Sequence, residues 1–161
     1  MSRKTMSVSI SGSGGSGAVT AGLVLLKSIA CAGFYGYLSR FSGPQIRGGE
    51  SSILLHFSDS PIETSPEISD IHYALDWNGF ERFSDEIPLS KESCIIYDRI
   101  KYKLPNMLLE LGANIIEVKV YDAVKKLKGS RPNAFAIGIL ANQMGLSLDA
   151  VSEALHQVLA K

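Results

Sequence analysis

Two glycine-rich segments contain the residues of this chain whose types and spacing best suit ligand binding. The first is Gly12-Ser-Gly-Gly-Ser-Gly17, and the second is Pro44-Gln-Ile-Arg-Gly-Gly-Glu50. Glycine lets the backbone approach a ligand closely and adopt positive φ. The free N–H groups of such a loop before a helix favour a phosphate. An arginine beside glycines adds a guanidinium group, whose paired N–H donors bind phosphate or carboxylate. The two segments therefore indicate an anionic ligand or a close-packed interface.

The first segment also fits the dinucleotide-binding fingerprint G-x-G-x-x-G through Gly12, Gly14 and Gly17. A nicotinamide enzyme of the usual kind needs an acid at the end of its second strand, and residues 38–40 offer none. Arg40 is instead suited to a 2′-phosphate, which keeps an NADP-binding interpretation open. The segment is not a Walker loop, because no Gly-Lys-Ser/Thr ends it. A structural interpretation also stays open, in which the glycines only allow tight packing of a helix on a sheet.

No other residues form a recognisable catalytic or metal-binding arrangement, so we predict no catalytic residue and no metal site in this chain. Two aspartates follow apolar runs, and we expect Asp76 to cap a helix and Asp98 to shape a turn. Cys31 and Cys94 are the only cysteines, which excludes a disulfide framework and a cysteine-ligated iron–sulfur cluster within the chain. The histidines lack metal-ligand spacing: His56, His72 and His156.

Predicted strands alternate with predicted helices along the chain. This alternation, with nearly continuous apolar strands, predicts an α/β fold. We expect three α/β/α layers, a mostly parallel (mixed) sheet and a Rossmann-like first βα unit, in a single domain over residues 1–161 with 1–6 disordered. The predicted strands are 7–10, 34–38, 51–57, 70–76, 93–98 and 114–120. The predicted helices are 18–32, 77–83, 121–128, 133–144 and a last one capped by Ser147.

Composition and charge narrow the class of protein. The chain has 161 residues with 16 residues of each charge sign, and the balance argues against a dedicated nucleic-acid or polybasic membrane binder. The first fifty residues nevertheless carry a net charge of +4 and the remaining 111 a net charge of −4, as an anion site near the glycines would need. The sequence shows neither a signal peptide nor a bilayer-spanning run. We expect a soluble, cytoplasmic protein whose partners include neither nucleic acid nor membrane.

Four blocks of the sequence resemble the gamma subunit, or fused gamma domain, of the 2-oxoacid:ferredoxin (acceptor) oxidoreductases. They occur in the order typical of that family and span almost the whole chain. The blocks are Ser11-Gly-Ser-Gly-Gly-Ser-Gly-Ala-Val-Thr-Ala-Gly22, Ser42-Gly-Pro-Gln-Ile-Arg-Gly-Gly-Glu50, the strand Asp70 to Asp76, and Asn133-Ala-Phe-Ala-Ile-Gly138 with Gly145-Leu-Ser-Leu-Asp-Ala150. The Ser42-Gly-Pro-Gln-Ile-Arg form is similar to variants in which the gamma domain precedes an alpha domain, so a further hypothesis is that this chain is the N-terminal domain of a longer protein.

The resemblance implies a non-catalytic component of a larger enzyme. That enzyme oxidatively decarboxylates a 2-oxo acid on thiamine diphosphate and passes electrons through iron–sulfur clusters to ferredoxin, and it commonly forms an acyl-coenzyme A. The gamma component docks on alpha and beta subunits or domains, which hold the thiamine diphosphate and the clusters. It binds no cofactor by itself and is implicated in handling coenzyme A. The resemblance leaves open which 2-oxo acid is used.

Carried onto this chain, the resemblance identifies the two glycine-rich segments as the site near the coenzyme A path or the subunit seam. The expected binding residues are Gly12, Ser13, Gly14, Gly15, Ser16, Gly17, Arg47, Gly48 and Gly49. Two alternatives stay open, namely a stand-alone NADP-binding reductase domain and a purely structural interaction module.

Overall fold

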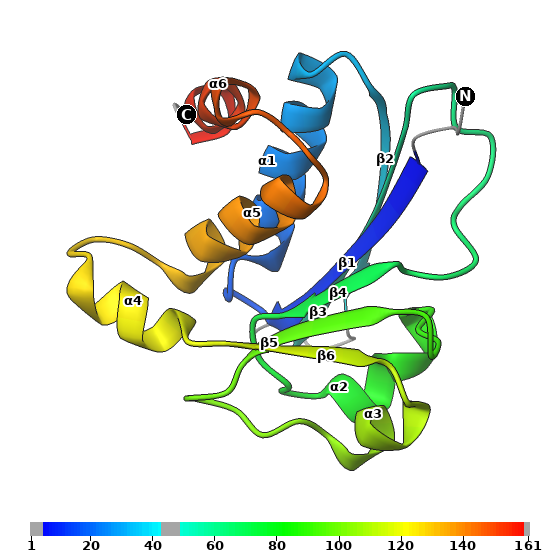
Figure 1. Cartoon of the computed structure of the whole chain (residues 1–161), viewed down its shortest axis with the longest axis vertical. Helices are drawn as coiled ribbons and strands as arrows, with labels where there is room; N and C mark the ends of the chain where they lie inside the picture. Colours follow the sequence, from blue (N-terminus) through cyan, green and yellow to red (C-terminus); the bar gives the residue numbers. More distant parts are fainter. Residues whose placement is uncertain (1–4, 43–48, 160–161) are drawn as a thin grey trace.

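A six-stranded sheet forms the centre of the fold (Figure 1). The computed structural model describes residues 5–42 and 49–159. The strands are β1 (Thr5–Ser13), β2 (Tyr35–Ser42), β3 (Glu50–Ser58), β4 (Ile71–Ala74), β5 (Cys94–Asp98) and β6 (Asn114–Val118), in the spatial order β2-β3-β1-β4-β5-β6. β1, β4, β5 and β6 are parallel neighbours, whereas β3 runs antiparallel to both β1 and β2. The sheet is therefore mixed, with parallel pairs in the majority.

The strand directions bring several loops to one edge of the sheet. The carboxyl ends of β1, β2, β4, β5 and β6 lie on this edge, together with the amino end of β3. In β1 and β3, for example, Ser13 pairs with Glu50. Ligand sites of open α/β sheets form at such a carboxyl edge, so this edge is where a binding site is expected.

Three helices lie on one side of the sheet, where α1 (Ala18–Cys31) packs on the strands and α5 (Pro132–Gln143) and α6 (Leu148–Leu159) pack against α1 (Figure 1). α1 packs on β1, β2 and β3 and also against α5 and α6. The main hydrophobic core lies between these helices and the strands, and its fully buried members include Val8, Leu25, Leu55 and Leu140. Gly22 allows α1 to approach the sheet closely, because a Cβ there would lie 2.9 Å from Ile53 Cγ1.

The opposite face of the sheet is covered by α2 (Phe80–Phe83), the 3₁₀ turn Ser84–Glu86 and α3 (Asn106–Leu111). A smaller core forms there from Phe80, Ile87, Ile95 and Leu108. The remaining helix, α4 (Val120–Lys126), connects β6 to α5 and lies at the carboxyl edge of the sheet (Figure 1). None of the described helices is long and apolar enough to cross a membrane.

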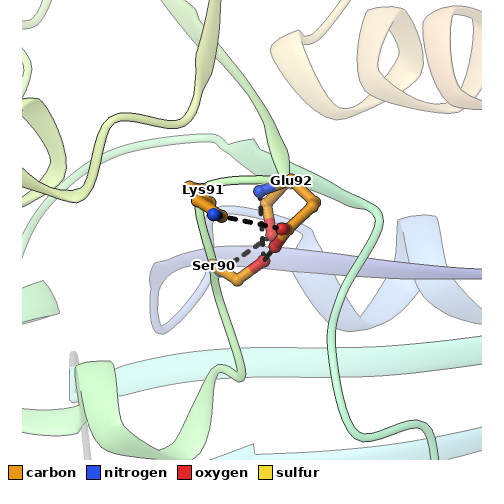
Figure 2. A network of polar contacts seen from close by, with 4 residues as sticks. Ser90, Lys91 and Glu92 are labelled. Carbon is orange, nitrogen blue, oxygen red and sulfur yellow. Dashed lines mark hydrogen bonds and ion pairs between the residues drawn. The ribbon is translucent and has the colours of Figure 1, made fainter.

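Serines connect the loops at the amino edge of the sheet. Before β5, Ser90, Lys91 and Glu92 form a compact polar turn, in which the Ser90 hydroxyl donates to Glu92 Oε2 at 2.7 Å (Figure 2). The Ser93 hydroxyl donates to the Ser69 carbonyl at 2.7 Å. The starts of β4 and β5 are thereby joined on the side of the sheet opposite to the carboxyl edge.

The predicted α/β fold with a mixed sheet is confirmed, while some element bounds were wrong. β1 begins at Thr5, so the expected disorder of residues 5 and 6 is wrong, and residues 1–4 lie outside the described residues. The helix α3 was not predicted, since its six residues are too few to display a clear helical period. The Ser147 cap is confirmed, because its hydroxyl accepts the Ala150 N–H at 3.2 Å.

Candidate anion-binding groove

The first glycine segment forms a tight loop between β1 and α1. The Ser16 N–H donates to the Ser13 carbonyl at 2.9 Å, which closes the turn. Gly15 and Gly17 have φ values of 90° and 93°, a left-handed region that side chains rarely adopt. At Gly12 a Cβ would lie 2.5 Å from Ser16 Oγ, so this position also requires glycine. These glycines are therefore set by the shape of the loop, and the loop leads directly into α1.

The second glycine segment meets the first through a backbone contact. The Gly14 N–H donates to the Gly49 carbonyl at 2.6 Å. Gly49 and Glu50 are buried at this junction, and Glu50 begins β3. Arg47 and Gly48, which were also predicted to bind the ligand, lie outside the described residues. The structure thus brings the ends of the two predicted segments together at one point.

Asp76 holds the glycine loop from the neighbouring strand. Its carboxylate accepts the Ser13 N–H at 3.0 Å and the Ser13 hydroxyl at 2.8 Å. It also accepts the Asn78 N–H at 3.0 Å. The predicted role of Asp76 as a helix cap is wrong, because Gly79 precedes α2 and no side chain caps that helix. Asp76 instead fixes where β1 ends and the loop begins.

A second helix begins beside the glycine loop. α5 starts at Pro132, and the side chain of Asn133 lies against Gly17, where a Cβ would come within 2.4 Å of the Asn133 amide nitrogen. Neither α1 nor α5 has an acidic residue in its first turn, and neither has a side-chain cap. The partial positive charge of two helix N-termini is therefore uncompensated by carboxylates of their own first turns.

These elements surround a groove of about 1440 Å³ at the carboxyl edge of the sheet. Six of the nine predicted binding residues line it: Ser13, Gly14, Gly15, Ser16, Gly17 and Gly49. Gly12 is absent from the lining and lies beneath the loop. Three cationic side chains also line the groove, namely Arg40, Lys101 and Arg131, together with two carboxylates, Glu50 and Asp76. The Asp76 carboxylate is occupied by the loop, which leaves a surface suited to an anion.

The cations of the groove come from three separate parts of the chain. Arg40 belongs to β2, Lys101 follows β5, and Arg131 precedes α5. The hydrogen bond with Tyr102 raises the pKa of Lys101, so its ammonium group is charged at neutral pH. Lys101, Arg131 and Asn133 line the groove and were not predicted from the sequence as binding residues. Of these three residues, only Arg131 has a neighbour that indicates its position, because it stands directly before a proline that begins a helix.

Trp77 is one of the lining residues of the groove, and its ring packs against the smaller core. Its ring centroid lies 5.0 Å from that of Phe80 and 5.9 Å from that of Tyr97, so its position is fixed by other rings. The indole Nε1 is buried and has no hydrogen-bond partner in the described part of the chain. Aromatic rings beside cationic groups suit a ligand that has both a flat ring and phosphate groups.

His72, whose ring lies beside that of Trp77, has a structural role. His72 is buried, with Nδ1 2.8 Å from the Ser9 hydroxyl and Nε2 3.1 Å from the Ser11 hydroxyl. Burial lowers the pKa of His72 to about 3, so the ring is neutral at physiological pH. Both ring nitrogens of this histidine therefore have hydrogen-bond partners within the sheet. It does not line the groove and is unsuited to act on a ligand there.

The second predicted aspartate shapes the neighbouring loop. Asp98 accepts the Ile100 N–H at 2.8 Å, which confirms the expected turn, and it also accepts the Tyr121 N–H in the first turn of α4. Among the described residues, no group of three or more His, Cys, Asp and Glu side chains could hold a metal ion. The described lining of the groove contains neither histidine nor cysteine. The arrangement can bind and orient an anion.

The strand order distinguishes this site from the usual dinucleotide fold. In that fold the second strand lies directly beside the first, whereas here β3 separates β1 from β2. Arg40 therefore belongs to a strand about 10 Å from β1, twice the spacing of neighbouring strands. Although Arg40 reaches the groove, the second strand is displaced from the place that the NADP interpretation assumed.

Comparisons with known proteins agree with this geometry. The family model described as pyruvate ferredoxin/flavodoxin oxidoreductase matches residues 7–161. The chain is 27% identical over 160 residues to the 2-oxoglutarate synthase subunit KorC of Archaeoglobus fulgidus. The aligned region covers 98% of this chain and 81% of that subunit.

Solved structures of low sequence identity share the fold. A 2-oxoglutarate:ferredoxin oxidoreductase from Magnetococcus marinus, with 2-oxoglutarate, coenzyme A and succinyl-CoA bound, matches 96% of this chain with a TM-score of 0.81 and 21% identity. The matched part is 27% of that longer chain. The pyruvate oxidoreductase subunit PORC from Thermotoga maritima matches 96% of this chain and 85% of its own length, with a TM-score of 0.72 and 19% identity. The keto/oxoacid ferredoxin oxidoreductase gamma subunit from Geobacter sulfurreducens matches 94% of this chain and 85% of its own length, with a TM-score of 0.70 and 20% identity.

Proposed function

Because the chain belongs to the pyruvate ferredoxin/flavodoxin oxidoreductase family, we propose that it is the gamma component of a 2-oxoacid:ferredoxin (acceptor) oxidoreductase. Its relatives are subunits of such enzymes. In this role it docks on alpha and beta subunits or domains and contributes to binding coenzyme A. The chemical step, which is oxidative decarboxylation of a 2-oxo acid, takes place on those partners in the cytoplasm.

The groove is the observation that carries this proposal. It combines a glycine loop, two helix N-termini without first-turn acids, and three cations. Coenzyme A has a diphosphate, a further phosphate and an adenine ring. The backbone N–H groups of the loop suit the phosphates, and Tyr102, an aromatic residue of the lining, suits the adenine. The Magnetococcus marinus enzyme, part of which shares this fold, has coenzyme A bound, and this supports coenzyme A as a ligand of the assembled enzyme.

The residues of this chain do not fit the other cofactors of the enzyme. An iron–sulfur cluster needs four thiolates as a rule, and the chain has Cys31 and Cys94 alone. Cys94 is partly buried, and desolvation raises the pKa of its thiol, which disfavours the thiolate that a cluster requires. We therefore assign the clusters, the thiamine diphosphate and the transfer of electrons to ferredoxin to the partner subunits.

The proposal is tested with the assembled enzyme and with Arg131→Gln. Removing this groove cation is expected to weaken coenzyme A binding by about 1.5–3 kcal/mol, as for a charged hydrogen bond. Isothermal titration calorimetry measures the affinity, and ferredoxin reduction with saturating 2-oxo acid measures the activity. Lys91→Gln, which removes an exposed cation at the opposite edge of the sheet, should leave both unchanged.

A reconstitution without this chain provides the second test. The partner subunits alone should lose coenzyme A-dependent turnover, and adding the chain back should restore it. Full turnover without the chain would contradict the proposal. Unchanged coenzyme A affinity in Arg131→Gln, with the complex intact, would contradict the assignment of coenzyme A to this groove and leave the docking role.

A further inference from the structure

One stretch of the chain is distinctly basic although the whole chain is neutral. Residues 98–131 contain eight lysines and arginines and four aspartates and glutamates, a net charge of +4 that equals the net charge of residues 1–50, and the negative charge lies in the other residues. The eight cations are Arg99, Lys101, Lys103, Lys119, Lys125, Lys126, Lys128 and Arg131.

The fold places this basic stretch at the rim of the groove. Lys101 and Arg131 line the groove itself, as do Gly129 and Ser130 just after the lysines of α4. α4 and its connection to α5 lie at the same carboxyl edge as the glycine loop (Figure 1). Lys125, Lys126 and Lys128 are exposed. We call the four lysines of this segment, Lys119, Lys125, Lys126 and Lys128, the α4 rim.

Two of the four carboxylates in the basic stretch already accept hydrogen bonds or form an ion pair within the chain. Asp98 accepts two backbone N–H groups, as described above. Glu117 accepts the Tyr97 hydroxyl at 2.9 Å and pairs with Arg99 at 3.4 Å. Glu110 and Asp122 are exposed to water. Positive charge therefore prevails on the rim, and the carboxylates Glu50 and Asp76 lie deeper, in the groove lining.

We propose that the α4 rim steers a polyanionic ligand into the groove and so raises its rate of association. This inference rests on the proposed function, because it takes coenzyme A as the anion. Exposed charges act over about 10 Å at 0.1 M salt, and a patch of one sign beside a cleft raises association rates by about tenfold or more. Since these lysines act before contact, they should change the association rate and leave the dissociation rate nearly unaffected.

The test compares two variants that remove the same charge in different places. The rim variant is Lys126→Gln/Lys128→Gln. The control is Lys27→Gln/Lys91→Gln, which removes one exposed cation from α1 and one from the turn before β5, at the amino edge of the sheet (Figure 2). Stopped-flow mixing with coenzyme A is followed by the fluorescence of Trp77, the single tryptophan of the chain and part of the groove lining. In the assembled enzyme, kcat/KM for coenzyme A measures the same capture step.

In the rim variant the association rate is expected to fall about 3- to 10-fold at about 20 mM ionic strength. The difference should vanish near about 0.5 M salt, and the control should match the unmodified protein throughout. Dephospho-coenzyme A, which lacks one phosphate, should show a smaller effect. Equal association rates in the two variants, or a rim variant that loses its partner subunits, would overturn the inference while leaving the proposed function intact. Failure of coenzyme A to bind the chain and the assembled enzyme would overturn both.

Discussion

At the scale of single residues, the glycine loop contains two positions with the same backbone conformation and different surroundings. Gly15 and Gly17 both have φ near +90°. A Cβ at Gly15 would meet nothing within 4 Å, whereas a Cβ at Gly17 would meet the side chain of Asn133. The pair therefore separates the cost of backbone strain from the cost of a steric clash.

Gly15→Ala is expected to lower the free energy of unfolding by about 1–2 kcal/mol, from strain alone. Gly17→Ala should lower it by about 1–3 kcal/mol more, because Asn133 must move. Urea unfolding measures both. The double variant Gly17→Ala/Asn133→Ala should recover most of the additional loss. Equal losses in the two single variants would show that the clash between a Cβ at position 17 and Asn133 does not affect stability.

At the scale of secondary structure elements, α6 shows how a correct helix prediction can assign a buried face that is right only at its centre. Leu148, Val151, Leu155 and Leu159 recur at helical spacing, which predicts that all four are buried, and of these Val151 is buried and Leu155 packs against the core. In the structure Leu148 is 87% exposed and Leu159 is 59% exposed, while Ala150, Val151 and Ala154 are buried. Small residues face α1 because the two helices pack closely, and hydrophobicity alone does not reveal that preference.

This arrangement predicts opposite outcomes for one substitution at two positions of α6. Ala154→Asp places a charge where no surface is exposed and should lower the free energy of unfolding by at least about 3 kcal/mol. Leu148→Asp should change it by less than about 0.5 kcal/mol. Chemical denaturation followed by circular dichroism distinguishes the two. A severe loss in Leu148→Asp would mean that the originally predicted stripe is correct.

At the scale of the whole molecule, the buried His72 makes folding stability depend on pH. Its pKa is about 3 when folded, against an ordinary value of 6.5. The unfolded chain therefore binds the proton more readily, and the stabilising contribution is complete above about pH 6.5 and is lost as pH falls toward 3. Protonation would place a charge among Ser9, Ser11 and the ring of Phe80, whose centroid lies 5.7 Å from that of the imidazole.

The difference in unfolding free energy between pH 7 and pH 4.5 is expected to be smaller in His72→Gln than in the unmodified protein, by about 2 kcal/mol. Urea denaturation at a series of pH values provides the measurement. His156→Gln is the matched control, because His156 is exposed and should leave the slope unchanged. The same slope in His72→Gln would show that another group controls acid stability.

The sequence was informative about the family, the α/β class and the glycine loop, and less so about the groove. The family prediction is confirmed by the match over residues 7–161. Glycines were recognisable because positive φ restricts the residue type, whereas Lys101 and Asn133 are common residues whose place depends on how distant elements meet. The antiparallel β3 between β1 and β2 was not predicted either, since residue periodicity does not state which strands are neighbours. Arg47 and Gly48 stay predictions.

The packing of α1 against α6 has a consequence for biosynthesis. α1 has one charged residue, Lys27, among its fourteen, and it packs against α6, near the other end of the sequence. During translation α1 therefore leaves the ribosome before the helix that packs against it has been made. The apolar surface that α6 later contacts stays exposed on the nascent chain until α6 emerges, as is typical of hydrophobic surface during folding.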